Sequence, residues 1–310
     1  METRSNLIYR DPIEGLDFSR IVAGVMLWGA WGKNLNAQDM CGLIEQCVDL
    51  GVTTFDHADI YGHYTTEKTF GEALALQPSL KDKIEIITKC GIRLVTPNRP
   101  ANKIKSYDTS KAHIIASVER SLADLGVDRL NLFLIHRPDP LLDLNELIEA
   151  IGELLESGKV MHFGVSNFKP SKVDTLDAYF FDLELATNQV QASLLHLDPF
   201  EDGTFDQCMT MGISPMAWSP LGGGKLFMAQ SDDPQVNRIR PVAQTLMEKY
   251  GASMDQIALA WLMRHPAQIL PVIGTGRFDR IASAWKALEI DMEREDWFAL
   301  LEASKGKEVD

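Results

Sequence analysis

Eight short segments rich in apolar and β-branched residues alternate with amphipathic helical patterns along this chain of 310 residues. Most are unbroken apolar runs, which is typical of parallel strands covered by helices on one face and by a packed interior on the other. Eight strand–helix repeats favour a closed (β/α)8 TIM barrel over an open doubly wound sheet. We therefore predict an α/β fold, with residues 1–310 forming a single barrel domain. The predicted strands are residues 20–27, 52–58, 84–90, 130–136, 163–167, 185–191, 214–219 and 269–274.

Residues typical of helix ends separate several of these segments. Asn36 precedes an apolar stripe that ends at Gly51, and Thr109 precedes another that ends at Gly126. A third helical pattern covers residues 144–157. The helices are therefore expected to begin and end at these residues.

Three connecting segments are expected to shape the two ends of the barrel. The Pro/Gly turn at residues 11–15 joins two short runs, which predicts a β-hairpin that caps the barrel bottom. Two connections after predicted strands, residues 91–109 and 220–240, are long. Long loops at the C-terminal ends of barrel strands are where binding sites are built.

Composition excludes several classes of protein. The chain has 30 basic and 44 acidic residues, a net charge of −14, and no Lys/Arg stripe, so nucleic acid is not an expected partner. No apolar stretch approaches the roughly 18 residues of a membrane span. The four cysteines show no CxxC spacing, which indicates reduced thiols in a cytoplasmic protein rather than a zinc site.

Polar side chains stand at the ends of successive predicted strands. Asp56 and Tyr61 follow the second strand, Lys89 ends the third and His136 ends the fourth. These strand ends converge in a barrel. An ammonium paired with Asp56 and close to the phenol would lower the phenol pKa from about 10, which predicts a general acid. Each residue alone also suits a structural role, since Tyr61 followed by Gly62 is typical of a turn.

Six motifs give the sequence a resemblance to the aldo-keto reductase superfamily. They stand in that family's order, at the predicted strand ends, and cover nearly the whole chain. The RPD after the histidine and the short C-terminus are more similar to the bacterial oxidoreductase branch than to the animal aldose reductases. The motifs are FDHADIYG (55–62), TKCG (88–91), LFLIHRPD (132–139), GVSNF (164–168), NQV (188–190) and WSPLGGG (218–224).

The resemblance implies an NADP-dependent oxidoreductase that acts on CH–OH donors and, in reverse, reduces an aldehyde or ketone. Hydride would come from nicotinamide C4, with Tyr61 as the proton donor. Lys89 would lower the pKa of Tyr61, Asp56 would hold Lys89, and His136 would orient the substrate carbonyl.

The resemblance also implies a set of cofactor-binding residues. Ser166, Asn167 and Gln189 would hold the nicotinamide carboxamide. Trp218 would stack on the ring, where the family usually has Tyr or Phe, although an indole in the core is the alternative interpretation. The full set is Ser166, Asn167, Gln189, Trp218, Ser219, Pro220, Leu221, Thr275, Gly276 and Arg280.

The phosphate groups are expected at the start of the last barrel helix. Residues 273–281 lack the third glycine of a Rossmann fingerprint, but a helix N-terminus after the eighth strand favours anions. The resemblance implies that Thr275 and Arg280 meet the 2′-phosphate of NADP. Gly274 and Ala284 stand where the family has Lys and Asn, and both departures weaken the preference for NADP.

The substrate is expected to be a small carbonyl compound that contacts Trp28, Arg137 and Trp218; its identity and the oligomeric state are not predicted. One alternative function is a non-catalytic barrel that keeps the nicotinamide site and serves as a redox-sensing subunit. The presence of all four chemical residues favours the enzyme.

A metal-dependent barrel hydrolase is the other alternative. The spacing argues against it, because the first strand carries no HxH and His162 precedes its strand. No metal is therefore expected. The residues that could be gathered as ligands are Asp56, His57, Asp59, His136, His162 and His196.

Overall fold

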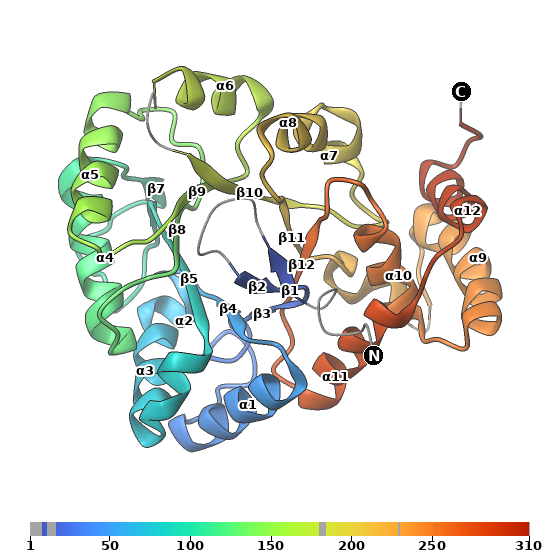
Figure 1. The fold of residues 1–310 in the computed structure, drawn as a ribbon, viewed down its shortest axis with the longest axis horizontal. Helices are drawn as coiled ribbons and strands as arrows, with labels where there is room; N and C mark the ends of the chain where they lie inside the picture. Colours follow the sequence, from blue (N-terminus) through green and yellow to red (C-terminus); the bar gives the residue numbers. More distant parts are fainter. Residues whose placement is uncertain (1–7, 11–16, 180–183, 229, 310) are drawn as a thin grey trace.

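Eight parallel strands form a closed barrel in the computed structural model, which describes residues 8–10, 17–179, 184–228 and 230–309 (Figure 1). The strand order around the barrel is β10–β11–β12–β3–β4–β5–β8–β9. The predicted fold is confirmed, and every barrel strand lies within its predicted segment. The strands are β3 (Val22–Gly24), β4 (Thr54–Asp56), β5 (Glu85–Cys90), β8 (Leu132–Ile135), β9 (Phe163–Ser166), β10 (Leu185–Gln191), β11 (Met216–Trp218) and β12 (Leu270–Ile273).

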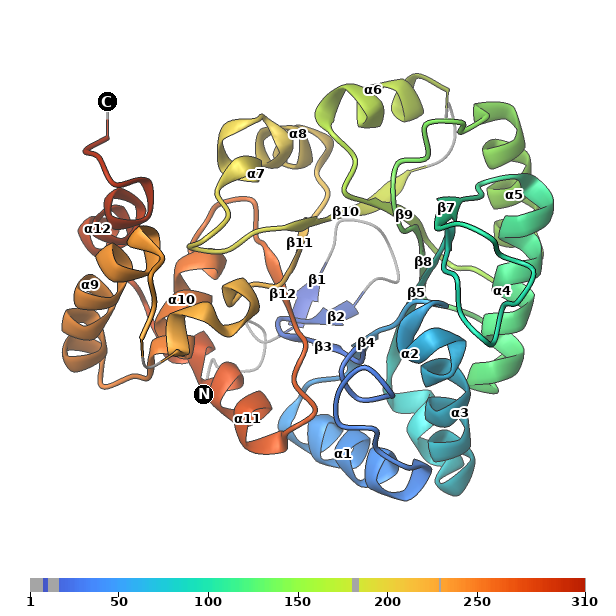
Figure 2. The same ribbon diagram turned by 180° about the vertical axis from the view of Figure 1, so that it is seen from behind.

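Helices surround the barrel on its outer side (Figures 1 and 2). Those of the surrounding ring are α1 (Ala37–Leu50), α3 (Thr66–Leu76), α4 (Lys111–Leu125), α5 (Leu144–Glu156), α6 (Pro170–Tyr179), α8 (Thr204–Met211), α10 (Met254–Met263) and α11 (Phe278–Lys286). Shorter or additional helical segments are α2 (Tyr61–Tyr64), η1 (Pro78–Lys83), α7 (Asp198–Glu201), η2 (Gly222–Phe227), α9 (Pro234–Tyr250), η3 (Ala287–Glu289) and α12 (Arg294–Lys305). Among the described residues, no helix is long and apolar enough to span a bilayer.

Both predicted end residues of α1 are confirmed, whereas the predicted N-cap of α4 is wrong. Asn36 caps α1 through its side chain, and Gly51 ends it with a left-handed φ of 104°. The cap of α4 is Ser110, not the predicted Thr109. The hydroxyl of Thr109 donates instead to the buried carboxylate of Asp139 at 2.9 Å, so it is not available to cap the helix.

The predicted N-terminal hairpin is confirmed by its strands. β1 (Ile8–Arg10) pairs antiparallel with β2 (Asp17–Ser19), while the turn at residues 11–15 lies outside the described residues. Phe18 of β2 packs among the side chains that fill the barrel interior. The backbone N–H of Ser19 donates to the hydroxyl of Thr54, the first residue of β4, at 2.9 Å. The hairpin therefore closes the end of the barrel where the strands begin.

The two long connections differ from each other in structure. The first contains the antiparallel pair β6 (Ile92–Arg93) and β7 (Ser106–Tyr107). The second ends earlier than the predicted residue 240, because α9 already begins at Pro234. Proline suits the first position of a helix, where its missing N–H costs nothing. The additional helices α9 and α12 pack against each other outside the ring (Figure 1).

Replacing Phe18 by Ala tests the closure of the barrel bottom. Phe18 is 1% exposed, and its removal leaves a cavity in the interior, so the free energy of unfolding should fall by roughly 3–5 kcal/mol. Urea denaturation measures the loss. Phe227→Ala, at a site 45% exposed, is the control and should change stability by no more than about 0.5 kcal/mol. Equal stabilities of the two variants would contradict the packing of Phe18 in the barrel interior.

Candidate active site

The four predicted catalytic residues meet at the C-terminal ends of neighbouring barrel strands. Asp56 ends β4, Lys89 lies near the end of β5, and His136 directly follows β8. Tyr61 reaches the same place from the segment after β4. All four are buried, with side chains at most 8% exposed. The barrel thus brings an acid, an amine, a phenol and an imidazole together.

The Lys89 ammonium is the centre of this group. It lies 2.7 Å from both carboxylate oxygens of Asp56 and donates to the backbone oxygen of His57 at 2.7 Å. Its distance to the hydroxyl oxygen of Tyr61 is 3.4 Å. From the opposite side of the barrel, the Gln189 amide donates to Asp56 at 2.8 Å. A buried ion pair is stable only when such additional hydrogen bonds satisfy it.

The expected lowering of the Tyr61 pKa is wrong for this structure. Burial raises the pKa of Tyr61 well above its usual value of 10.0, and the Asp56 carboxylate raises it further, while Arg137 opposes them. Burial also lowers the pKa of Lys89, although Asp56 counteracts it. The phenol therefore holds its proton near neutral pH, which is the state a proton donor needs.

His136 is a neutral imidazole beside the phenol. Its ring meets that of Tyr61 edge-on, with the centroids 6.1 Å apart. Burial and the charges of Lys89 and Arg137 lower the pKa of His136 well below 6.5. A neutral imidazole carries one N–H, so His136 can donate one hydrogen bond without bringing a positive charge into the site.

A left-handed turn fixes the position of Tyr61. The three residues after it, Gly62, His63 and Tyr64, have φ values of 58°, 60° and 68°. A Cβ atom at Gly62 would lie 2.5 Å from the Thr66 hydroxyl oxygen, so only glycine fits. The turn indicated by Tyr61–Gly62 is confirmed, and it serves the placement of the phenol.

The long loop after β5 is attached to this turn. The hydroxyl of Tyr64 donates to the backbone oxygen of Ile92 at 3.2 Å and accepts from the N–H of Leu94 at 2.9 Å. The Asn98 amide donates to the backbone oxygen of His63 at 2.8 Å. These bonds hold the loop next to the residue that carries the phenol.

The predicted nicotinamide residues form a connected polar row. The Ser166 hydroxyl donates to the backbone oxygen of Gln189 at 2.8 Å, and the Asn167 amide donates to Ser166 at 2.7 Å. The indole N–H of Trp218 donates to the Asn167 amide oxygen at 2.9 Å. Hydroxyl and amide groups in one row offer both donors and acceptors, which is what a carboxamide requires.

The predicted phosphate residues lie at the start of α11. The Arg277 guanidinium is not available to a phosphate group, because it pairs with Asp279. Arg280 is exposed, and its side chain has no hydrogen bond or ion pair within the described ranges. Thr275 accepts the N–H of Arg277 on its hydroxyl, next to Gly276.

Three further predicted cofactor residues directly follow β11. Ser219 has a left-handed φ of 51°, which turns the chain away from the strand. Pro220 is buried and Leu221 is half-buried. These residues join Trp218 to η2, at the same end of the barrel as the polar row.

The predicted substrate role of Trp28 is wrong. Its side chain is fully buried against Phe55 and Phe70, and its indole N–H donates to the backbone oxygen of Thr275 at 2.9 Å. Trp28 therefore supports the segment before α11 from within the core. The half-buried Trp31, with its ring centroid 6.0 Å from that of Tyr61, lies at the site instead.

Arg137 and Trp218 line a cavity of about 340 Å³ at the barrel mouth. The Arg137 guanidinium lies 5.3 Å from the centre of the indole ring. Asn167 also lines this cavity, together with other polar side chains such as Gln191 and Thr204. The cavity thus adjoins the predicted nicotinamide residues.

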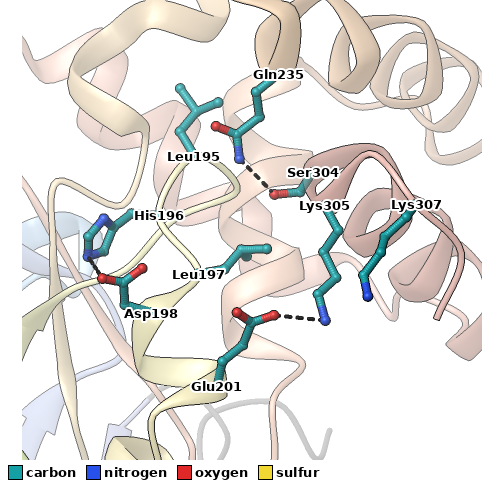
Figure 3. A pocket seen from close by; sticks show the side chains of 9 residues that line it. All are labelled: Leu195, His196, Leu197, Asp198, Glu201, Gln235, Ser304, Lys305 and Lys307. Carbon is teal, nitrogen blue, oxygen red and sulfur yellow. Dashed lines mark hydrogen bonds and ion pairs between the residues drawn. The ribbon is translucent and has the colours of Figure 1, made fainter. Parts of the chain in front are cut away.

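A larger cavity, of about 570 Å³, lies between the segment after β10 and the helices α9 and α12 (Figure 3). Lys305 pairs there with Glu201 at 2.7 Å, and Gln235 donates to Ser304 at 3.2 Å. None of the four catalytic candidates lines it. They do not line the smaller cavity either, but Arg137, which directly follows His136 in the sequence, lines it together with Asn167 and Trp218 of the polar row.

The side chains considered as metal ligands do not form a metal-binding cluster. Within the described ranges, no three His, Cys, Asp or Glu side chains form a group that could hold a metal ion. His57 packs its ring 4.4 Å from that of Phe70, and His162 directly precedes β9.

Comparison with known proteins assigns the family. The sequence pattern of the Aldo/keto reductase family matches residues 20–305. The chain belongs to this family. As an aldo/keto reductase it is an oxidoreductase of carbonyl compounds, with a fold that binds a nicotinamide cofactor.

Relatives of this aldo/keto reductase include bacterial proteins that it matches over nearly their whole length. It is 46% identical to the "Uncharacterized oxidoreductase YcsN" of Bacillus subtilis, over 96% of this chain and 97% of that protein. It is 43% identical to the "6-dehydroglucose reductase" of Agrobacterium fabrum, over 95% and 97%. Its fold is similar to that of the thermostable aldo-keto reductase Tm1743 bound to the inhibitor epalrestat, with a TM-score of 0.80, 24% identity and coverage of 96% and 99%.

Sequence reasoning missed one buried acid of this aldo/keto reductase. Glu67, in the first turn of α3, is 5% exposed. The sequence carries a signal for it, because Glu67 precedes the buried Phe70, Gly71 and Leu74 at helical spacing and so stands on the apolar stripe.

Removing Lys89 tests the buried ion pair of the aldo/keto reductase. Lys89→Met leaves the Asp56 carboxylate buried without a cation, so the free energy of unfolding at pH 7 should fall by roughly 3–5 kcal/mol. The double variant Asp56→Asn, Lys89→Met contains no buried charge at this pair and should recover most of the loss. Urea denaturation of both decides the point. If the single variant is as stable as the double variant, the unpaired Asp56 carboxylate costs no stability, and the buried ion pair does not have the role described.

Proposed function

We propose that this aldo/keto reductase catalyses the NADPH-dependent reduction of an aldehyde or ketone to an alcohol, and the reverse reaction, with Tyr61 as proton donor. The observation that carries the proposal is the 3.4 Å distance from the Lys89 ammonium to the Tyr61 hydroxyl oxygen in a buried site. A protonated phenol next to a cation is ready to lose its proton to a developing alkoxide.

The proton step follows from the arrangement around Tyr61. The phenol holds its proton near neutral pH, because burial and Asp56 raise its pKa. When the proton moves to the carbonyl oxygen, a phenolate forms beside the Lys89 ammonium, which stabilises it. Asp56 holds Lys89 in place at 2.7 Å.

His136 suits the orientation of the carbonyl group. Its neutral ring can donate an N–H to the same oxygen that receives the proton from Tyr61, since the two rings lie edge to face. Two donors at one oxygen fix its position, which lowers the barrier by orientation.

The cofactor residues fit a nicotinamide dinucleotide. Bound nicotinamide would supply the hydride from C4. Ser166 and Asn167 would hold its carboxamide, and Gln189 would join them, although its amide nitrogen donates to Asp56. Trp218 would present an indole face to the ring, with Ser219, Pro220 and Leu221 beside the polar row.

The proposed site of the 2′-phosphate is the start of α11. Among the described residues no side chain pairs with the Arg280 guanidinium, and the helix N-terminus favours an anion. Thr275 and Gly276 precede the helix and complete the site. Gly274 and Ala284 stand where the family has Lys and Asn, so they offer no polar side chain to the phosphate. Arg280 should therefore carry most of the preference for NADPH over NADH.

A small, polar carbonyl compound fits the smaller cavity best. Its lining is rich in polar side chains, with Arg137 and Trp218 at the rim. Two relatives, 43% and 37% identical, are named 6-dehydroglucose reductase, which supports a hydroxylated aldehyde as substrate. The four cysteines are free and buried, which supports the reducing cytoplasm as the compartment.

Replacing Tyr61 by Phe tests the proton donor. The variant keeps the ring and should bind NADPH normally, but kcat for aldehyde reduction should fall by roughly 10²-fold or more, because the general acid is gone. Tyr179→Phe on the outer helix α6, where the side chain is 50% exposed, is the matched control, and its kcat should stay within about three-fold. Turnover by Tyr61→Phe at the rate of the control would refute the assignment.

Replacing Arg280 by Ala tests the cofactor preference. A phosphate–Arg contact contributes roughly 1.5–3 kcal/mol, so NADPH should bind about ten-fold to a hundred-fold more tightly than NADH, and the variant should lose most of this ratio. Titration of tryptophan fluorescence measures both affinities. Arg277→Ala, whose guanidinium is engaged by Asp279, is the control and should keep the ratio. Equal binding of NADH and NADPH by the unaltered protein would contradict the role of Arg280.

A further inference from the structure

A second buried carboxyl group, that of Glu67, stands behind the catalytic strand. It accepts a hydrogen bond from the Thr88 hydroxyl at 2.5 Å and from the Ser121 hydroxyl at 2.9 Å. These partners belong to β5 and α4, while Glu67 belongs to α3. The carboxyl group therefore links a barrel strand to two helices on the outer face of the barrel.

Thr88 directly precedes Lys89 in β5. Successive side chains of a strand point to opposite faces, so Thr88 points to the helices and Lys89 into the barrel. Fixing the Thr88 side chain from outside also fixes the backbone that carries the ammonium. Glu67 and Lys89 thus lie on opposite sides of the same strand, Glu67 outside the barrel and Lys89 inside it.

The two groups also interact electrostatically. Lys89 lowers the pKa of Glu67, and Glu67 raises the pKa of Lys89. Burial outweighs the cation and raises the pKa of Glu67 to about 7. In the described part of the chain no Lys, Arg or His forms an ion pair with Glu67, so Lys89 is the cation that acts on it across the strand.

We propose that Glu67 is a positioning residue for the reduction: it holds Thr88, and its charge offsets that of Lys89, so that protonating Glu67 strengthens the field of the ammonium on Tyr61. The inference rests on the proposed function, because the phenolate that this field stabilises forms only when Tyr61 is the proton donor.

The direction of the effect follows from the charges. Ionised Glu67 is a second anion near an ammonium that Asp56 already neutralises at 2.7 Å. When Glu67 is neutral, more of the Lys89 charge acts on the forming phenolate. Interactions of this kind extend over several ångströms at an effective dielectric constant of about 20. The kcat for reduction should therefore decrease as the pH rises through about 7.

Other titratable groups face the same region and must be separated from Glu67. From the segment after β4, Asp59 is buried with a pKa well above 3.8, partly because of Glu67. From α4, Asp124 raises the pKa of Glu67, and Arg120 lowers that of Asp59. From β5, burial raises the pKa of Cys90. α1, which also packs against α3, buries Cys41 and Cys47, whose thiol pKa values are raised.

The first experiment compares pH profiles of kcat between pH 5.5 and 9, with NADPH and glyceraldehyde as the probe substrate. Glu67→Gln keeps the shape but cannot ionise; one acceptor oxygen becomes an N–H donor, whose hydrogen bond the hydroxyl of Thr88 or Ser121 can accept. We expect the inflection near pH 7 to disappear and kcat at pH 8 to rise about three- to ten-fold over the unaltered enzyme. Glu85→Gln removes a carboxylate bonded to Thr54 at the other end of β5 and should leave the profile unchanged.

Two further variants separate position from charge and exclude the neighbouring acid. Thr88→Val removes the hydrogen bond to Glu67 but leaves the Glu67 carboxyl group able to ionise. The kcat should therefore fall with KM unchanged, while the pH profile of kcat keeps an inflection. Asp59→Asn should keep the inflection. If the inflection survives in Glu67→Gln, or disappears in Asp59→Asn instead, the inference is overturned.

The second experiment needs no turnover. The Glu67 carboxyl signal in NMR spectra of protein with ¹³C-labelled glutamate is identified by its loss in Glu67→Gln. It should titrate near pH 7 and move to higher pH in Lys89→Met, because coupling between the two groups is reciprocal. An unchanged titration in Lys89→Met overturns the inference even when activity is intact. A shifted titration together with no NADPH oxidation on any aldehyde would instead count against the proposed function.

Discussion

The ion pair between Asp56 and Lys89 is buried in the closed barrel, and it holds the ammonium beside the Tyr61 hydroxyl. β4 and β5 are neighbours in parallel register, which places the two side chains at the same end of the interior. Two charges without water need full hydrogen bonding, and here the backbone of His57 and the amide of Gln189 complete it. Gln189 comes from β10, far along the chain, so only closure of the sheet satisfies the pair.

Burial has opposite effects on the two partners of the proposed proton step. It makes the phenol of Tyr61 a weaker acid at rest and the ammonium of Lys89 easier to deprotonate. The Asp56 carboxylate keeps the ammonium charged, but it also opposes the phenolate. In the proposed reaction, the phenol would keep its proton at neutral pH and release it only to a stronger base, a developing alkoxide. The Glu67 carboxyl group on the other side of β5 also favours the charged form of Lys89.

The two halves of the barrel supply different parts of the site. The candidate catalytic side chains come from the strand ends of β4, β5 and β8, and the left-handed turn after Tyr61 is tied to the loop that follows β5. The polar row and the segment before α11 come from β9 to β12. The buried Trp28 connects the halves, because it packs on Phe55 of β4 and bonds to the backbone of Thr275 after β12. Interior packing thus aligns the two sets of residues.

The sequence by itself determined the barrel and its four candidate catalytic residues, because strand–helix alternation and the polar residues that end strands are local, periodic signals. Tertiary structure alone decided which groups are buried and what they contact. Trp28 and Trp31 stand three residues apart and each is followed by a glycine, yet only Trp31 reaches the site. The raised pKa of Tyr61 and the carboxyl group of Glu67 behind Lys89 likewise depend on desolvation by segments distant in the chain, which no local pattern records.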